Sequence, residues 1–231
     1  MNSISVITPT YNEEATIVGT LDAVSRLVNP VEIIIVDGGS TDKTVELIEA
    51  YEGTKPLKLV QTGFTNRGLQ LHEGTKHATG EVYWFLHADT RPRQGAGTQI
   101  LKFMKYKEVV GGSFEIVFIG GTRASRFLTW LYPQLRSIGL VYGDSAFYVR
   151  KSSYDEVGGF QDFPLFEDVD LFQKLRKKGV WKFITLPVET SSRRFENHLF
   201  LWVFAKWSVR QVLYWFGIPP RWLGKSYKAV R

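Results

Sequence analysis

Short runs of β-branched and aromatic residues alternate with longer segments of helical periodicity in the first part of the chain. The strand-like runs are 4–8, 32–36, 57–61 and 82–86, and the helical segments between them include 14–27 and 41–51. Successive strands that are joined by helices pair in parallel, because a parallel connection needs a crossover. The pattern therefore predicts an α/β fold with a mostly parallel sheet flanked by helices.

The second part of the chain has a different pattern. Residues 111–118 and 146–150 have the composition of strands, and 122–135 predicts an amphipathic helix that carries Arg123 and Arg126. The chain has no repeats and no long Pro- or Gly-rich linker. We therefore expect a single domain at 1–196, followed by a distinct helical tail at 197–231.

The tail is apolar and aromatic, and it holds four of the seven tryptophans. Its polar residues Lys206, Arg210 and Gln211 predict one narrow polar stripe on an amphipathic helix. The charges at Lys206 and Arg210 argue against a transmembrane span and favour an interfacial helix, with peripheral membrane contact through 197–217. Packing of the same surface against the core or against a second subunit is the alternative.

Composition narrows the chemistry and the partners. The chain has no cysteine, which excludes disulfides, thiolate metal sites and a cysteine nucleophile. A formal net charge of +6 favours anionic partners. The cations are spread along the chain and do not alternate with aromatics, so nucleic acid is not a predicted partner. The N-terminus lacks a basic leader and a long apolar stretch, so we expect a cytoplasmic protein, peripheral on the inner face of the membrane if the tail binds there.

Polar residues follow three of the predicted strands, at 9–13, 37–40 and 87–89. Ligands of parallel α/β sheets bind beyond the carboxyl ends of the strands. Asp37 precedes two glycines and could reach a ligand, or it could support the turn. Asp89 could bind Mg²⁺ or Mn²⁺ with the help of His87 or a water, or it could be a turn acid.

Acids also open a predicted helix in the second part of the chain. Glu167, Asp168 and Asp170 would complement the helix dipole there, or one of them could be a general base. His72, His77 and His198 are isolated and predict packed or surface side chains. A Walker-type loop and a GxGxxG after the first strand are both absent from the sequence, which argues against triphosphatases and dinucleotide enzymes.

Four motifs taken together resemble family 2 glycosyltransferases. VITPTYNEEATI, IIIVDGGSTDKT, ATGEVYWFLHADT and FEDVDL occur in the family's order over nearly the whole chain. The chain is most similar to a small bacterial branch that has FLHADT in place of the usual DxD signature, with GDSAFYVRKSSYDEVGGF before the ED motif. The resemblance implies a glycosyltransferase A-type (GT-A) fold with a Rossmann-like sheet, a nucleotide-sugar half at 1–92 and an acceptor half at 93–196.

The resemblance also implies a reaction and residue roles. The reaction is inverting transfer of a sugar from a nucleotide-diphosphate donor to an acceptor hydroxyl, with Asp168 as the base and Mn²⁺ or Mg²⁺ held by Asp89 at the diphosphate. Together with the membrane contact expected for the tail, this predicts a carbohydrate or lipid-linked acceptor. The residues implied in donor binding are Pro9, Tyr11 and Glu13 at base and ribose, Asp37 at the base, Arg67 at phosphate, and His87 in support of Asp89. His87 departs from the commoner carboxylate and brings no negative charge.

Two other functions remain open from the sequence. A nucleotidyltransferase would share the nucleotide-binding half, but it would carry a Gly-rich basic loop where this chain has TPTYNEE. A non-catalytic protein that binds a nucleotide-sugar or a membrane partner is favoured only by His87, and Asp89 with the Glu167–Asp168 pair argues against it.

Overall fold

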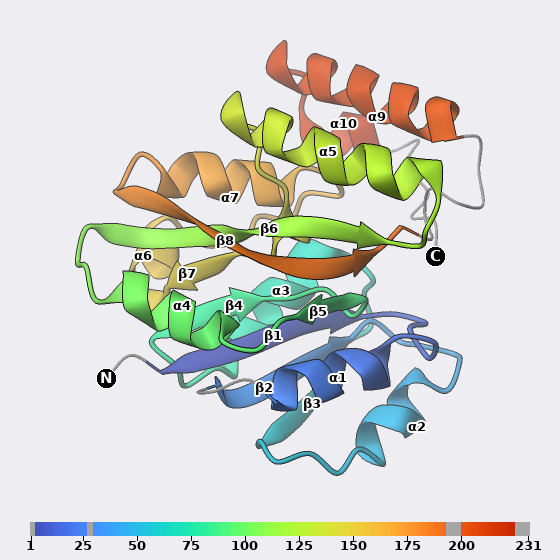
Figure 1. Cartoon of the computed structure of the whole chain (residues 1–231), viewed down its shortest axis with the longest axis vertical. Helices are drawn as coiled ribbons and strands as arrows, with labels where there is room; N and C mark the ends of the chain where they lie inside the picture. The colour runs from blue at the N-terminus through green and yellow to red at the C-terminus, as the bar shows by residue number, and fades with distance from the viewer. Residues whose placement is uncertain (1–2, 27–29, 193–199, 225–231) are drawn as a thin grey trace.

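The computed structural model describes residues 3–26, 30–192 and 200–224. Within these residues the strands form one eight-stranded sheet in the order β3-β2-β1-β4-β7-β6-β8-β5 (Figure 1). The strands are β1 (Ile4–Thr10), β2 (Pro30–Asp37), β3 (Leu57–Gln61), β4 (Val82–Phe85), β5 (Thr90–Pro92), β6 (Val109–Ile119), β7 (Tyr148–Arg150) and β8 (Val180–Ser191).

The first four strands in that order pair in parallel, and so do β6 and β8. β7 is antiparallel to both of its neighbours, and β5 is antiparallel to β8. The prediction of a mostly parallel sheet is confirmed.

Both faces of the sheet are covered by helices, which explains why its central strands are apolar throughout. Ile4 and Val6 of β1 point to one face, and Ile7 points to the other. The first face packs on α1 (Ile17–Ser25), α2 (Thr44–Glu49) and α4 (Ala96–Met104), and the second packs on α3 (Arg67–Lys76), α6 (Lys151–Glu156) and α7 (Glu167–Leu175).

A third apolar cluster lies at the end of the molecule where α5, α9 and α10 gather (Figure 1). It joins α5 (Arg123–Ser137), α9 (Phe200–Trp215) and α10 (Pro220–Gly224) to the segments around η1 (Gly143–Ser145) and the start of α7. Tyr142 and Phe166 are buried at its centre. The C-terminal helices therefore pack next to the start of α7, where the ED motif lies, and next to the residue before it.

Several elements have bounds or identities that the sequence patterns did not give. The helix predicted at 122–135 begins at Arg123, where the Thr122 hydroxyl accepts a hydrogen bond from the Ser125 amide. α3 was not predicted, because RGLQLHEGTK contains two glycines and few apolar residues. β8 was also not predicted, because Pro187 interrupts a run that otherwise resembles a strand.

The predicted polar stripe of the tail is wrong at Gln211. This side chain is only 3% exposed, and its Oε1 accepts a hydrogen bond from the Tyr142 hydroxyl over 3.0 Å. Val209 and Val212 are instead 58% and 43% exposed. α9 therefore packs a polar residue inward and presents apolar residues to the outside. Of the predicted contact 197–217, residues 197–199 lie outside the described residues, and no helix in the described part of the chain combines the length and hydrophobicity that a bilayer crossing requires.

Candidate active site

Three predicted site loops begin at neighbouring strand ends. β2, β1 and β4 are adjacent in the sheet, and Thr10 at the end of β1 is the register partner of Asp37 at the end of β2. The Gly38 amide donates to the Thr10 carbonyl oxygen over 2.9 Å, which ties the two exits together. The carboxyl ends of these parallel strands thus meet at one edge, as the sequence predicted.

The Asp37 carboxylate holds the turn that follows β2. The side chain is buried, and its Oδ2 accepts hydrogen bonds from the Gly39 and Ser40 amides over 2.8 and 2.9 Å. Its Oδ1 accepts from the Ser40 and Thr10 hydroxyls. Four donors occupy this carboxylate, so the turn-supporting role left open by the sequence is present in the structure.

The loop after β1 is attached to the loop after β2. The predicted base- and ribose-contacting residues Pro9, Tyr11 and Glu13 are all half-buried, Pro9 near the end of β1 and the other two on this loop. Asn12 between them has a φ of 55°, and its amide donates to the Ser40 hydroxyl over 2.9 Å. Asparagine tolerates this left-handed backbone conformation better than most residues. The turn held by Asp37 therefore also positions the loop at 9–13.

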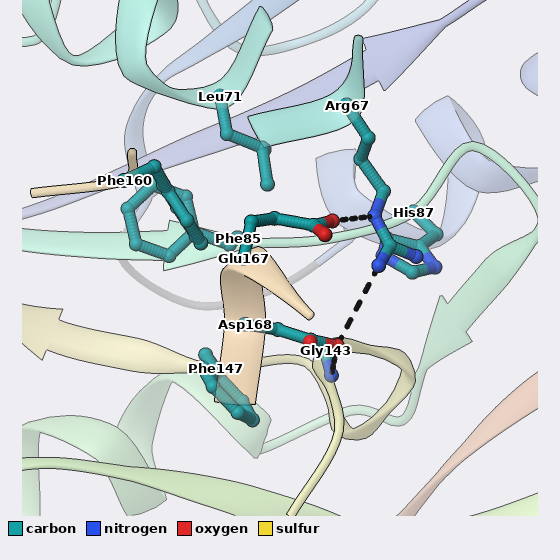
Figure 2. A pocket seen from close by; sticks show the side chains of 9 residues that line it. All are labelled: Arg67, Leu71, Phe85, His87, Gly143, Phe147, Phe160, Glu167 and Asp168. Carbon is teal, nitrogen blue, oxygen red and sulfur yellow. Dashed lines mark hydrogen bonds and ion pairs between the residues drawn. The ribbon is translucent and has the colours of Figure 1, made fainter. Parts of the chain in front are cut away.

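A cavity joins two predicted donor-binding residues of the first half, Arg67 and His87, to the ED motif of the second (Figure 2). Arg67 at the start of α3 reaches into it. Nine residues line the cavity: Arg67, Leu71, Phe85, His87, Gly143, Phe147, Phe160, Glu167 and Asp168. Of the predicted site residues, the structure therefore brings Arg67, His87 and Asp168 together here. Pro9, Tyr11, Glu13, Asp37 and Asp89 are not among the residues that line it.

The Arg67 guanidinium lies among three carboxylates. Its Nε is 2.6 Å from Glu167 Oε1, its Nη2 is 3.5 Å from Asp168 Oδ2, and its Nη1 is 3.8 Å from Asp144 Oδ1. The close approach of α3 to α7 makes this possible, because a Cβ at Gly68 would lie 2.9 Å from the Cγ of Glu167. Arg67, which was predicted to meet phosphate, is paired with both acids of the ED motif in the structure.

The Asp168 carboxylate is buried and fixed by two backbone amides. Gly143 donates to its Oδ2 over 2.6 Å, and Val169 donates to its Oδ1 over 2.8 Å. Burial, followed by the charge of Glu167, raises the pKa of Asp168 to about 6, although Arg67 and the Gly143 amide act in the opposite direction. A carboxylate with this pKa is ionised at neutral pH and is a stronger base than an exposed aspartate.

Backbone strain is stored directly before the ED motif. Phe166, the residue before Glu167, has a φ of 65°, which is an outlier conformation for a bulky side chain. The ring is buried and stacks on Tyr214 of α9 with centroids 4.8 Å apart. Packing against the C-terminal helices therefore helps to hold the residue that directs Glu167 and Asp168 into the cavity.

His87 has a carboxylate partner that the sequence patterns did not identify. Its Nδ1 lies 3.2 Å from Asp144 Oδ1, and the Tyr132 hydroxyl donates to Asp144 Oδ2 over 3.2 Å. Asp144 thus places a negative charge next to the position where the commoner motif has an acid. The only sequence signal for Asp144 was its place in the motif GDSAFYVRKSSYDEVGGF. The spacing of residues along the chain does not indicate that η1 lies next to the end of β4.

Asp89 lies in the turn that links β4 to β5. The turn is closed by the Thr90 amide, which donates to the His87 carbonyl oxygen over 3.0 Å, and Asp89 is half-buried. Across the residues that the structure describes, no group of three or more His, Asp or Glu side chains is arranged to hold a metal ion. In proteins, one or two carboxylates can also bind Mg²⁺ when substrate phosphates complete its coordination.

The isolated histidines have structural surroundings. His72 Nδ1 is 3.0 Å from the Tyr154 hydroxyl, and His77 Nε2 is 3.6 Å from Glu73 Oε1. Both fit the prediction of packed or surface side chains, while His198 lies outside the described residues.

Solved structures of glycosyltransferases share this fold. The ligand-bound structure of Staphylococcus aureus TarS 1-349 with UDP-GlcNAc aligns with a TM-score of 0.68 at 19% identity, over 83% of this chain and 59% of that one. The mannosyltransferase PcManGT of Pyrobaculum calidifontis, with GDP-Man and Mn²⁺, aligns with a TM-score of 0.67 at 23% identity, over 81% of this chain and 56% of that one. The predicted GT-A fold is confirmed.

Sequence comparison leads to the same group of proteins. The probable glycosyltransferase YdaM of Bacillus subtilis (strain 168) is 28% identical over 76% of this chain and 47% of its own length. An undecaprenyl-phosphate 4-deoxy-4-formamido-L-arabinose transferase of Pectobacterium carotovorum is 31% identical over 54% of this chain and 38% of its own. The chain spans about half the length, or less, of these curated relatives. The model of the family described as glycosyl transferase family 2 matches residues 5–156, and the chain therefore belongs to that family.

Proposed function

We propose that this protein is an inverting glycosyltransferase that moves a sugar from a nucleoside-diphosphate donor to an acceptor hydroxyl. The observation that carries the proposal is the buried Asp168 carboxylate, which lies in a cavity beside Arg67 with its pKa raised to about 6. Membership of family 2 and the nucleotide-sugar ligands of the aligned structures support it.

Asp168 would act as the general base. As the acceptor oxygen attacks the anomeric carbon from the face opposite the diphosphate, Asp168 takes the hydroxyl proton, and the bond from that carbon to the phosphate oxygen breaks. One direct displacement inverts the configuration of the sugar. The Gly143 and Val169 amides hold the carboxylate in one orientation, and general-base assistance of this kind contributes about 10²–10⁴-fold in rate.

The donor would bind across the loops at the sheet edge. Pro9, Tyr11 and Glu13 would contact the base and ribose, and Asp37 would hydrogen-bond the base in addition to holding its turn. Arg67 would exchange part of its contact with the acids for the diphosphate, because its side chain is 34% exposed and faces the cavity.

Asp89 would hold a divalent cation, Mn²⁺ or Mg²⁺, which would supply positive charge to the diphosphate leaving group. His87 would support this site. Asp144 holds its Nδ1, so Nε2 is the ring nitrogen that would be left to contact the cation or the donor. Mn²⁺ in the PcManGT structure is consistent with this role.

We further propose a carbohydrate or lipid-linked acceptor, with the protein peripheral on the cytoplasmic face of the membrane through 197–217. The relative from Pectobacterium is named undecaprenyl-phosphate 4-deoxy-4-formamido-L-arabinose transferase, and the lipid phosphate in that name supports a lipid-linked acceptor. The exposed valines of α9 supply apolar surface for such contact.

The test is the pair Asp168→Asn and Asp155→Asn. Asp155 is an exposed carboxylate on α6 and serves as the matched control. Donor affinity is measured by calorimetry, and nucleoside diphosphate release is measured from UDP- and GDP-sugars with Mn²⁺ and extracted membrane lipids. The proposal expects a loss of about 10²–10⁴-fold in Asp168→Asn with donor affinity retained. Equal turnover in both variants refutes the base, and donor binding without turnover in the wild type supports the non-catalytic alternative.

A further inference from the structure

The helices α5, α9 and α10 gather at one end of the molecule (Figure 1), and large apolar side chains on or next to them are exposed. Trp130 of α5, Phe216 after α9 and Trp222 of α10 are 61%, 82% and 71% exposed. We call the following set of exposed residues the outer helical surface: Arg123, Arg126, Phe127, Trp130 and Ile138 from the α5 region, Lys206, Val209, Val212, Trp215 and Phe216 from the α9 region, and Arg221 and Trp222 from α10.

Helical periodicity places these residues together on each helix. In α5, residues 123, 126, 127, 130 and 134 are exposed and recur at intervals of three and four, so they form one face. In α9 and directly after it, residues 206, 209, 212, 215 and 216 are exposed and recur in the same way. The opposite faces share the apolar cluster around Tyr142 and Phe166, so both helices turn their outward faces away from the same core.

Charge is distributed unevenly between this end and the rest of the chain. α5, α9 and α10 contain six basic residues and no acidic one. These six equal the formal net charge of +6, so the remainder of the sequence is electrically balanced. The outer helical surface thus combines exposed tryptophan and phenylalanine with arginine and lysine, the residue types that favour the headgroup region of an anionic bilayer.

We propose that the outer helical surface docks the protein on an anionic lipid bilayer, with α5 and α10 contributing alongside α9. The inference rests on the membrane contact proposed above for the tail, and it adds two helices and the charge of the lipid. A second copy of the chain is a poor occupant, because a symmetric interface would bury the basic residues of both copies and these helices contain no acidic residue to pair with them. An anionic surface complements them.

Docking in this way also places the active site near the bilayer. The inward side of α9 contacts Tyr142 through Trp207 with ring centroids 4.7 Å apart, and it contacts Phe166 through Tyr214. Tyr142 precedes the Gly143 amide that holds Asp168, and Phe166 precedes the ED motif. The bilayer-facing helix α9 therefore directly contacts Tyr142 and Phe166, the residues that precede the backbone positioning the base. This arrangement suits an acceptor held at the membrane.

The experiment is flotation of the full-length chain with vesicles of phosphatidylcholine alone and of phosphatidylcholine mixed with phosphatidylglycerol. The aromatic test variant is Trp130→Ser with Trp222→Ser, and its control is Tyr106→Ser, which changes a residue that is 55% exposed outside these helices. The charge test variant is Arg123→Gln with Arg126→Gln, and its control is Lys102→Gln with Lys105→Gln, both exposed on and after α4. Each basic residue near an anionic surface contributes about fivefold in partitioning.

The proposal expects the wild type to float with the anionic vesicles and much less with the neutral ones. Both test variants are expected to lose about tenfold or more in partitioning, and both controls are expected to retain it. Equal flotation of test and control variants, or no preference for anionic lipid, overturns the proposal. The proposal is also overturned if light scattering shows a stable dimer that dissociates in Trp130→Ser.

Nucleotide binding separates this inference from the proposed function. UDP and GDP titrations of the same variants without vesicles are expected to match the wild type, because the substituted residues lie outside the cavity. Flotation without any nucleotide binding would refute the proposed function and leave docking intact. Nucleotide binding without flotation would refute docking and leave the nucleotide-sugar transferase function intact.

Discussion

Replacing Arg67 with glutamine is expected to move the acid limb of the pH–rate profile upward. Arg67 Nη2 is 3.5 Å from Asp168 Oδ2, and its Nε is 2.6 Å from Glu167 Oε1. Two unit charges about 4 Å apart interact by about 4 kcal/mol at an effective dielectric constant of about 20. The Arg67 side chain is 34% exposed, so we halve that value, to about 2 kcal/mol, to allow for solvent screening.

This energy converts into a measurable shift. About 2 kcal/mol corresponds to about 1.5 pKa units at about 1.36 kcal/mol per unit. The pKa of Asp168 would rise from about 6 in the wild type by this amount. Because only the ionised carboxylate accepts the proton, the kcat of Arg67→Gln is expected to fall about fourfold at neutral pH and to recover about two units above that.

The assay is kcat against pH at saturating donor, with KM recorded separately. A lost diphosphate contact would raise KM at every pH, whereas the altered base moves only the acid limb. Arg93→Gln is the control, because Arg93 forms an exposed ion pair with Glu189 at 2.9 Å. An acid limb that stays at the wild-type position in Arg67→Gln refutes the coupling of Arg67 to Asp168.

Three further predictions concern the same acid cluster. Because the pKa of Asp168 is raised, the folded state binds its proton more tightly than the unfolded chain does. The free energy of unfolding of the wild type should therefore fall by up to about 3 kcal/mol as the pH rises from about 4 to about 6. Urea unfolding across that pH range should show no such fall in Asp168→Asn. Asp144→Asn removes the partner of His87 and should lower Mn²⁺-dependent UDP affinity by about tenfold in calorimetry, whereas Asp155→Asn should not. Gly143→Ala places a Cβ 3.1 Å from Asp168 Oδ2 and should reduce kcat while leaving the circular dichroism spectrum unchanged.

The sheet edge could be predicted from sequence because its signals are local. Runs of apolar residues mark β1, β2 and β4, and each ends in polar residues, so the exits at Asp37 and His87 followed from the order of the elements. Most of the fold could be predicted from the alternation of strand-like and helical segments and from the resemblance to family 2. The sequence did not decide whether Asp37 reaches a ligand or supports its turn, because the hydrogen-bond donors to its carboxylate depend on how the residues after β1 and β2 meet.

The arrangement around the base depended on tertiary contacts that the sequence does not display. Asp144 reaches His87 only because η1 returns to the end of β4. Arg67 meets Glu167 because α3 packs closely against the start of α7. Gln211 was expected on the outer stripe, but the Tyr142 hydroxyl supplies a buried partner for its side chain on the inner face of α9.

The central claim is tested most directly by a thermal-shift panel of UDP, GDP, CDP and dTDP, each with and without Mn²⁺, on the wild type and Asp89→Ala. A ligand that binds only the folded state stabilises it by about 2.7 kcal/mol at about a hundred times its dissociation constant. We predict a metal-dependent shift for one nucleotide that disappears in Asp89→Ala. The absence of a shift with every nucleotide would contradict a nucleotide-sugar donor site at this sheet edge.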